Sequence, residues 1–425
     1  MHCRVGSEDA DRMHADAGVT PQHCLQGLRA TMIFNFRLFW RVTVRSFYRS
    51  AGTNGPLTRN RFVVLMLFYP IWGGLTFLAW LGFALDEVFF AAYQQQVVDK
   101  PLFIVSNFRS GSTFAQRTLM RDEDTFTGMR TGDIYLMPSV IQRRIFSLLA
   151  RIDALFGHMC EKALRRLDAL CLGQLRIHPF SLFDAEEDEH LLFYAWSTFF
   201  VGFAFPYLDE MPPYQYFDTE IPRGERLRIM AFYRSCIKRH LYATGGRHYI
   251  AKNPLFSAKI ESLLETFPDA RILYLVRNPL EMLPSTISLF GYVWRRFSKP
   301  QQKYPHCDKI LAWTKYWYDH PLEVIDRESP QRCMIITYDD LMQSPDSVFR
   351  SIYSRFGYPE SEALETLLRD AVTEARAHSS SHRYSYETMG FSREQIVREF
   401  AHIFERFGFD QHEPAETQML ESSSV

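Results

Sequence analysis

One long uninterrupted hydrophobic run stands out in the first quarter of the chain. Residues 62–85 carry no charged side chain, and a run of this length can cross a bilayer as one helix. Pro70 and the pair Gly73-Gly74 lie inside it, and such residues are typical of a kink or a re-entrant hairpin. The run predicts a membrane-associated element, with a single span and a hairpin both open. A buried core helix is the alternative.

The residues before this run predict a basic helix. Arginines recur every fourth residue from Arg37 to Arg49, and no acidic residue lies between Asp16 and Asp86. On a helix this spacing makes one basic stripe, with the aromatic rings largely elsewhere. The pattern is typical of a helix on an anionic membrane surface, and an exposed helix of a soluble domain is the alternative. We therefore predict that residues 29–97 form a membrane-associated segment.

From residue 101 onward, short apolar runs alternate with amphipathic segments. The apolar runs predict strands at residues 102–106, 249–252, 271–276 and 334–338. Helices are predicted to follow from Thr113, Asn253-Pro254, Asn278-Pro279 and Ser344-Pro345. Asn or Ser before Pro is typical of a helix N-terminus. The alternation predicts an α/β fold, in which a parallel sheet is covered by helices on both faces.

A second uncharged run covers residues 191–208. It contains Gly202 and Pro206 and has acidic clusters on both sides, so we interpret it as core or as the wall of an acceptor pocket rather than a second span. The catalytic domain is predicted at residues 98–410. The ends, residues 1–28 and 411–425, are predicted to be disordered.

Composition excludes several classes of protein. The net charge of -1 provides no overall basic field, so bulk nucleic-acid binding is not expected. With 47% hydrophobic residues, most of the chain is expected to fold. The seven cysteines include no CxxC pair, and no cluster with metal-ligand spacing is visible. We therefore expect no metal, while the oligomeric state stays open.

The first candidate for chemistry is the segment FIVSNFRSGST, residues 103–113. A buried strand runs into a loop of small residues and then into a helix start, where backbone N–H groups and the helix dipole favour an anion. Arg109 adds a full positive charge. The GxxxxGK[ST] spacing of a Walker A loop is absent.

The second candidate follows the predicted strand at residues 271–276. Arg277 ends this strand, at the edge where open α/β sheets place their ligands, and Ser285 follows eight residues later. An arginine at this position is poor core filling and a good anion clamp. A structural ion pair is the alternative for Arg277.

Together, the segments NFRSGST and RNPLEMLPS resemble the sulfotransferases that use 3′-phosphoadenylyl sulfate (PAPS), a family with a P-loop-like fold. The segment AKNPLFSAKIESLLETFPDARILYLVRNP is similar to the bacterial and Golgi-like branch, and the resemblance covers roughly residues 101–410. It implies transfer of a sulfuryl group from PAPS to a hydroxyl or amine.

The resemblance also implies roles for single residues. Ser110, Gly111, Ser112 and Thr113 would hold the 5′-phosphate, and Arg277 with Ser285 would hold the 3′-phosphate. Arg109 takes the place of a loop lysine found in many relatives. The relatives' C-terminal R-K-G loop is not evident here, and the segment with Arg383 is the candidate replacement.

Candidate catalytic residues divide into cations and bases. Negative charge builds on the leaving group, and Arg109 and Lys252 are the cations expected to stabilise it. The acidic run FDAEEDEHLL resembles an E-D-E element of related sulfotransferases, in some of which a Glu is the base. Glu187 is the first choice, Glu189 the second, and His190 a rival because imidazole titrates near neutral pH. A solvated helix start is the alternative for this run.

Two other functions stay open from the residues alone. One is an ATP- or GTP-dependent phosphotransferase, against which the missing Walker A spacing argues. The other is a non-catalytic nucleotide-binding membrane protein. The acceptor is left open among small molecules, lipids and carbohydrates.

Overall fold

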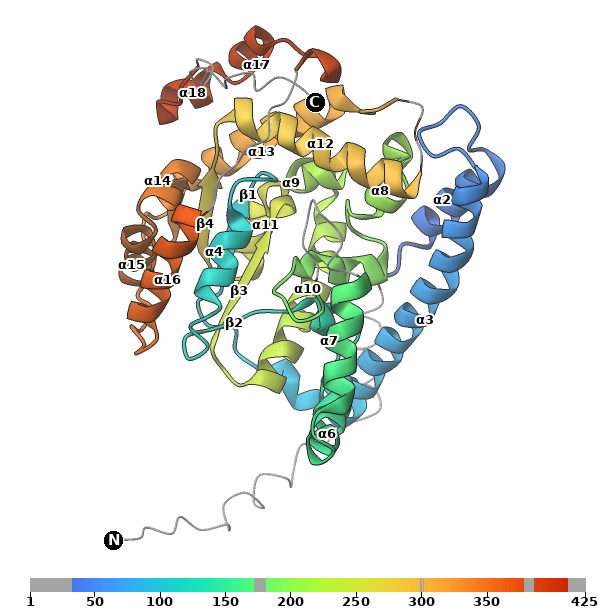
Figure 1. The fold of residues 1–425 in the computed structure, drawn as a ribbon, viewed down its shortest axis with the longest axis vertical. Coiled ribbons are helices and arrows are strands. Elements are labelled where there is room, and N and C mark those ends of the chain that lie inside the picture. The colour runs from blue at the N-terminus through green and yellow to red at the C-terminus, as the bar shows by residue number, and fades with distance from the viewer. Residues whose placement is uncertain (1–32, 172–180, 299, 301, 378–385, 412–425) are drawn as a thin grey trace, which may run out of the picture.

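The computed structural model describes residues 33–171, 181–298, 300, 302–377 and 386–411 (Figure 1). The predicted disordered N-terminus, residues 1–28, lies outside the described residues, as do residues 412–425 of the predicted tail.

Five parallel strands form one sheet in the order β2-β3-β1-β4-β5. They are β1 (Leu102–Ser106), β2 (Phe126–Thr127), β3 (His248–Asn253), β4 (Arg271–Val276) and β5 (Cys333–Thr337). The four predicted strands are confirmed. Val105 of β1 lies opposite Asn253 on one side and Tyr274 on the other, so the carboxyl ends of three strands meet at one edge. Because the chain passes from β3 across β1 to β4, β1 marks the switch point where such sheets bind ligands.

Helices cover both faces of the sheet, as predicted. One core lies under α4 (Ser112–Leu119), α14 (Tyr338–Gln343), α15 (Pro345–Phe356) and α16 (Leu364–Ala377). The other lies under α10 (Arg223–Thr244), α11 (Ile260–Thr266), α12 (Pro279–Phe297) and α13 (Cys307–Arg327). Successive residues of β1 point to opposite cores, since Phe103 and Val105 join the second while Leu102 and Ile104 join the first.

Shorter elements fill the connections. The remaining α-helices after residue 100 are α5 (Thr131–Tyr135), α6 (Val140–Leu155), α7 (Met159–Cys171), α8 (Val201–Ala204), α9 (Phe217–Glu220), α17 (Arg393–Glu399) and α18 (Ala401–Phe407). The 3-10 helices are η1 (Ala91–Gln95), η2 (Asp188–Ala195), η3 (Leu208–Glu210), η4 (Tyr214–Tyr216), η5 (Pro254–Ala258) and η6 (Glu387–Met389).

The predicted helix start at Asn278 is confirmed, because its Oδ1 accepts from the Leu280 amide at 3.0 Å. The start at Asn253 is confirmed only locally. Its Oδ1 accepts from the Leu255 amide, but the chain forms the short η5 turn, and α11 begins only after Lys259. Lys259, with φ -128°, leaves the helical path there.

The N-terminal region contains α2 (Phe36–Tyr48) and α3 (Arg59–Phe89). Among the described residues, α3 is the one helix long and apolar enough to cross a membrane. It is continuous through Pro70, so the re-entrant hairpin is wrong. Contacts at both ends hold it extended along the body: Arg61 donates to the Phe297 carbonyl at 2.8 Å, and Asp86 pairs with Arg239 at 3.0 Å. Figure 1 shows α3 running along one side of the molecule.

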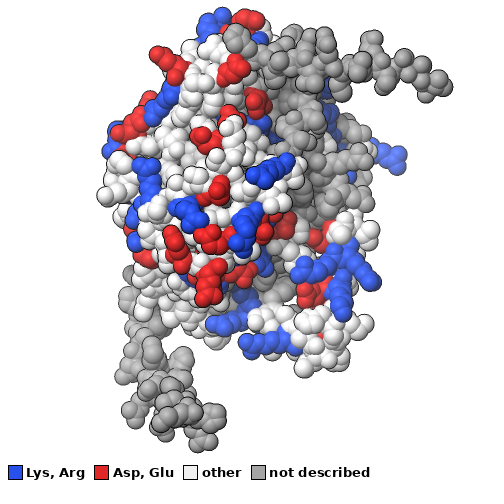
Figure 2. Space-filling model, turned by 60° about the vertical axis from the view of Figure 1, so that its left-hand side comes forward, with Lys and Arg blue, Asp and Glu red and all other residues white. Residues whose placement is uncertain are grey.

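The opposite side carries helices α14 to α16. Figure 2 brings this side forward and shows acidic and basic side chains interspersed over it. Such mixing gives no strong field of one sign on this face, in agreement with the net charge of -1.

Candidate active site

A cavity of about 1020 Å³ lies at the carboxyl edge of the sheet. It joins the loop after β1, the ends of β3 and β4, the segment before η2, and the helices α3 and α12. Most of the predicted site residues line its polar end, namely Arg109, Ser110, Gly111, Ser112, Thr113, Glu187, His190, Lys252 and Arg277. The sheet therefore brings together residues that are up to 168 positions apart in sequence.

The loop after β1 is shaped by left-handed backbone positions. Gly111 has φ +82° and caps α4, and a Cβ added to it would lie 2.9 Å from Cδ2 of Tyr338. Only glycine fits there. Arg109 also has a positive φ, of 63°. The loop thus turns sharply, so that the N-terminus of α4, with its partial positive charge, meets the cavity.

The two predicted anion-binding motifs contact each other directly. Arg109 donates from Nε to Oγ of Ser285 at 3.1 Å, and Arg277 donates from Nη1 to the carbonyl oxygen of Arg109 at 2.8 Å. The guanidinium of Arg277 lies 4.1 Å from the centre of the Tyr338 ring and pairs with Glu281 at 2.8 Å. Arg277 is therefore held in the cavity wall by a ring and a carboxylate.

The acidic run is buried rather than solvated. Glu187 accepts from Lys252 Nζ at 2.9 Å, and both side chains line the cavity. Asp188 points into the core, where the hydroxyls of Tyr233 and Tyr249 donate to it. Burial raises the pKa of Asp188 to about 7.

Glu189 also points away from the cavity. Its carboxylate pairs with Lys259 and accepts from Thr198 at 2.9 Å, and its side chain is only 1% exposed. Burial lowers the pKa of Lys259, although the Glu189 carboxylate opposes this shift. This placement argues against Glu189 as the base, because Glu189 is not among the residues that line the cavity.

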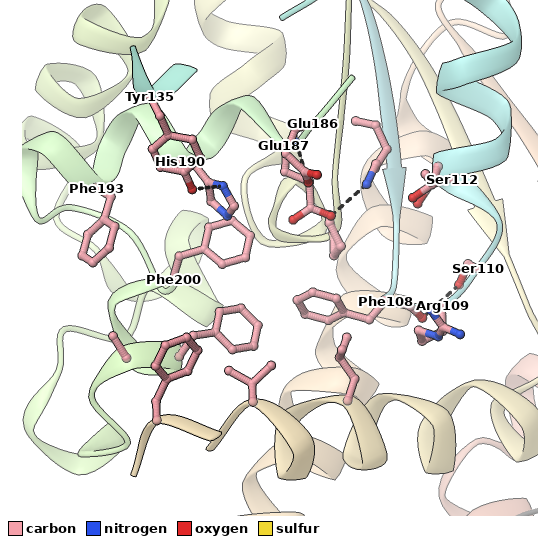
Figure 3. A pocket seen from close by; sticks show the side chains of 18 of the residues that line it. Phe108, Arg109, Ser110, Ser112, Tyr135, Glu186, Glu187, His190, Phe193 and Phe200 are labelled. Carbon is pink, nitrogen blue, oxygen red and sulfur yellow. Dashed lines mark hydrogen bonds and ion pairs between the residues drawn. The ribbon is translucent and has the colours of Figure 1, made fainter. Parts of the chain in front are cut away.

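His190 lies on the aromatic side of the cavity, away from the loop after β1 (Figure 3). Its Nδ1 is 2.6 Å from the hydroxyl of Tyr135. Burial lowers the pKa of His190, although nearby carboxylates such as Glu186 oppose the shift, so its imidazole is neutral at pH 7. In Figure 3, Glu187 lies between Ser112 on the loop and His190 on the aromatic side.

The apolar end of the cavity is built from two segments that are distant in sequence. Phe193, Phe200 and Phe205 come from the run at residues 191–208, which confirms that this run is core and pocket wall. Phe68 and Trp72 come from α3, and the Trp72 ring stacks on Phe193 with centroids 4.3 Å apart. Figure 3 shows the rings of Phe193 and Phe200 on the side of the cavity away from Arg109.

Among the lining residues that the sequence analysis did not propose are Tyr338, Glu186 and Tyr135. Tyr338 directly follows β5 at the ligand-binding edge, and that position was a usable signal. Glu186 precedes the predicted E-D-E element and lines the cavity, whereas nothing local distinguishes Tyr135. Arg383 lies outside the described residues.

Among the described residues, one group has the spacing of a metal site: Asp218, Glu261 and His320. The Asp218 carboxylate already accepts from the Glu261 amide at 2.9 Å and contacts His320 Nε2 at 3.0 Å. These contacts tie α9, α11 and α13 together, away from the cavity lining. We therefore interpret the group as structural.

Comparison with known proteins identifies the family to which this chain belongs. The model of the sulfotransferase family matches residues 101–362. The chain belongs to the sulfotransferase family. This enzyme is therefore a PAPS-dependent sulfotransferase, and the two other functions left open by the sequence are set aside.

Curated and solved relatives agree with this assignment. The sulfotransferase is 28% identical over 373 residues to omega-hydroxy-beta-dihydromenaquinone-9 sulfotransferase Stf3 of Mycobacterium bovis, over 84% of this chain and 89% of the relative. The crystal structure of sulfotransferase STF9 from Mycobacterium avium matches with a TM-score of 0.62 and 16% identity, covering 91% of this chain and 90% of that one. Sulfotransferase STF1 from Mycobacterium tuberculosis H37Rv matches with a TM-score of 0.57 and 17% identity, covering 88% and 100%. These two structures show the fold.

Proposed function

We propose that this sulfotransferase binds PAPS at the polar end of the cavity and transfers its sulfuryl group to a hydroxyl on a lipid. One observation carries the proposal: a single cavity runs from the anion-binding loop to the apolar surface of α3. The donor residues and the apolar wall are thus parts of one site.

The residues at the polar end fit the anionic groups of PAPS. The turn at Gly111 presents the N-terminus of α4 to the 5′-phosphosulfate, with Ser110, Ser112 and Thr113 beside it. Arg277 and Ser285 are the residues proposed for the 3′-phosphate. The guanidinium of Arg277 lies over the Tyr338 ring and pairs with Glu281, so its position is fixed before the ligand binds.

When bound, PAPS supplies a sulfuryl group, and adenosine 3′,5′-bisphosphate leaves. Arg109 and Lys252 both line the cavity, and we assign to them the stabilisation of negative charge on the leaving phosphate. Glu187 is proposed to accept the proton of the acceptor hydroxyl, with its carboxylate positioned by Lys252. His190, held by Tyr135, is the second candidate for this role.

The proposed acceptor is a hydroxyl at the end of a long apolar chain. The cavity wall beyond His190 is formed by aromatic rings and by Leu67 and Ile71 of α3, whose side chains are also more than half exposed. An apolar chain therefore has a continuous path from the site to the protein surface. The Mycobacterium bovis relative is named for a hydroxylated menaquinone, which is an acceptor of this kind.

We also propose that the enzyme associates with one leaflet of a membrane through α3. Both ends of α3 are bonded to the catalytic body, at Arg61 and at Asp86. If α3 crossed the bilayer, its two bonded ends would lie on opposite sides of a hydrocarbon core about 30 Å thick, and the catalytic body bonded to both ends would have to lie inside the bilayer. If one exposed face of α3 instead contacts the leaflet, its apolar surface leaves water and its bonds to the catalytic body are kept.

The test uses purified full-length enzyme. In a thermal-shift panel, adenosine 3′,5′-bisphosphate should raise the melting temperature while ATP and GTP should not. With radiolabelled PAPS, a long isoprenoid alcohol should accept label faster than a short alcohol or a simple sugar. Stabilisation by ATP alone would contradict the donor proposal, and preferred labelling of the sugar would contradict the lipid acceptor.

A further inference from the structure

The helices α6 and α7 form a hairpin whose apolar residues face outward. Only Val140 and Asp153 are buried among the 16 residues of α6. Large apolar side chains on it are between 43% and 83% exposed, namely Ile145, Leu148, Leu149, Ile152, Leu155 and Phe156. Soluble proteins rarely leave so large a continuous apolar surface in water, and such surfaces mark interaction sites.

The hairpin is an ordered element and not a loose loop. The carboxylate of Asp153 accepts from the amides of Cys160 and Glu161, at 2.8 and 2.9 Å, and so caps α7. The most exposed large apolar residues of the hairpin flank or lie in its turn: Leu155 ends α6, Phe156 follows it, and Met159 begins α7. Turns of soluble hairpins are usually polar, so this apolar tip indicates a non-aqueous environment.

The hairpin is attached directly to α3. The Asp86 carboxylate of α3 accepts from the amides of Val140 and Ile141, at 2.8 and 2.9 Å, and caps α6. Gln142 of α6 donates to the Leu78 carbonyl of α3 at 3.2 Å. Figure 1 shows α6 and α7 beside the C-terminal half of α3, with α6 extending beyond the body. The exposed apolar surface of α3 therefore continues onto the hairpin.

Charge indicates which partner covers this surface. Residues 140–171 contain six basic residues (Arg143, Arg144, Arg151, Lys162, Arg165 and Arg166) and three acidic ones, a net charge of +3. Arg143 is nearly buried and pairs with Asp133 at 2.7 Å, so the other five basic residues are the ones available to a partner. Helix α2, which lies beside the other end of α3 in Figure 1, adds Arg37 and Arg41, while its Arg45 pairs with Glu210 at 2.7 Å. Basic residues around an apolar surface complement anionic lipid headgroups above hydrocarbon.

We propose that the α6–α7 hairpin is a second membrane-binding element, which inserts its apolar tip into an anionic leaflet beside α3. Two anchors fix the orientation of the catalytic body, whereas α3 alone would leave it free to rotate about the helix axis. That the membrane also supplies the lipid acceptor depends on the proposed function. That the hairpin binds a membrane does not depend on it.

The test is flotation of the full-length enzyme with vesicles of phosphatidylcholine and phosphatidylglycerol. The double variant Leu148→Glu/Leu155→Glu places two charges on exposed hairpin positions, so folding is expected to be retained. It should bind these vesicles at least about tenfold more weakly than the unchanged enzyme. The control Leu227→Glu/Ser354→Glu adds the same charge on exposed positions of α10 and α15 and should bind like the unchanged enzyme.

Two results would overturn the inference. One is equal vesicle binding by the hairpin variant and the unchanged enzyme. The other is a dimer of the unchanged enzyme that the hairpin variant abolishes without loss of vesicle binding, which would identify a second copy as the partner. Thermal stabilisation by adenosine 3′,5′-bisphosphate is measured on the same variants, because it tests the donor site independently of the membrane.

Discussion

Arg277 donates a hydrogen bond from Nη1 to the carbonyl oxygen of Arg109, at 2.8 Å. The two residues belong to the two motifs on which the family resemblance depends. Ser285 of the second motif accepts a hydrogen bond from Nε of Arg109. The loop and the start of α12 therefore hold each other in place, and a substitution in one motif is expected to affect the other.

Arg277→Ala should weaken binding of adenosine 3′,5′-bisphosphate. Loss of one partner of a desolvated charged pair costs roughly 2–5 kcal/mol. Isothermal titration calorimetry measures this change directly. Arg350→Ala is the control, because Arg350 is exposed and pairs with Glu365 away from the cavity lining. Unchanged affinity of the Arg277 variant would remove this residue from the donor site.

Arg109→Ala should lower kcat more than it lowers donor affinity. Its guanidinium is proposed to act on charge that develops in the transition state, and removal of one such donor typically costs about a hundredfold in rate. Arg109→Lys keeps the charge and should recover part of the rate. Steady-state kinetics with PAPS as the varied substrate measure kcat and KM for each variant and so distinguish a loss of rate from a loss of donor binding. A variant with normal kcat and weakened donor binding would make Arg109 a binding residue only.

Local sequence signals were sufficient for four of the five strands and for most of the predicted helix starts, whereas the two-residue strand β2 was not predicted. Residues 272–276 are apolar throughout, and Asn278 before Pro279 caps the next helix through its own Oδ1, which accepts from the Leu280 amide. The donor loop was predictable for the same reason, since its strand, small residues and helix start are contiguous. Because β4 pairs with β1 in the sheet, Arg277 at the end of β4 lies beside the donor loop.

The directions of the acidic side chains were not predictable. Glu187 turns toward Lys252 in the cavity, while Glu189 turns toward Lys259 in the core. These partners lie 65 and 70 residues away. A run of four acidic residues is ordinarily solvated, and only tertiary contacts show which carboxylates face the substrate.

The continuity of α3 was not predictable from its sequence either. Pro70 and two glycines indicated a break in the helix, which packing against the body prevents.

Asp188→Asn should change how stability depends on pH. The pKa of Asp188 is about 7 in the folded protein, because of burial, against 3.8 ordinarily. Between these values the folded state holds more protons than the unfolded state, so the Asp188 contribution to stability is lost as pH rises toward 7. Asparagine cannot ionise. The stability of the variant relative to the unchanged enzyme should therefore increase with pH and level off above about pH 7.

Urea unfolding at pH 5, 6, 7 and 8 measures this difference. Both hydroxyls donate to Oδ2 of Asp188, and the amide oxygen of asparagine can take that place and accept from Tyr233 and Tyr249, so any remaining packing cost is a constant offset. Asp209→Asn is the control. Its hydrogen bond from Lys309 lowers the pKa of Asp209 below 3.8, so the corresponding difference should be flat over this range. A flat difference for Asp188→Asn as well would contradict the buried-carboxyl interpretation.

The last prediction concerns the base. Glu187→Gln should retain donor binding and lose at least about a hundredfold in kcat, as expected when a general base is removed. The glutamine keeps an oxygen that can accept from Lys252 Nζ, so the lysine stays positioned and the loss reports on proton transfer. His190→Asn should have the smaller effect, because Glu187 contacts Lys252 of β3, the strand next to β1 and its loop, whereas His190 contacts Tyr135.

The pH dependence of kcat/KM separates the two bases further. Burial lowers the pKa of His190 below 6.5, so a histidine base would lose activity only below that pH, as the imidazole takes up a proton. Tyr135→Phe removes the hydroxyl that contacts Nδ1 and would move such an acid limb. With Glu187 as the base, Tyr135→Phe leaves the limb in place. Normal turnover of Glu187→Gln together with an inactive His190→Asn would transfer the role from the carboxylate to the imidazole.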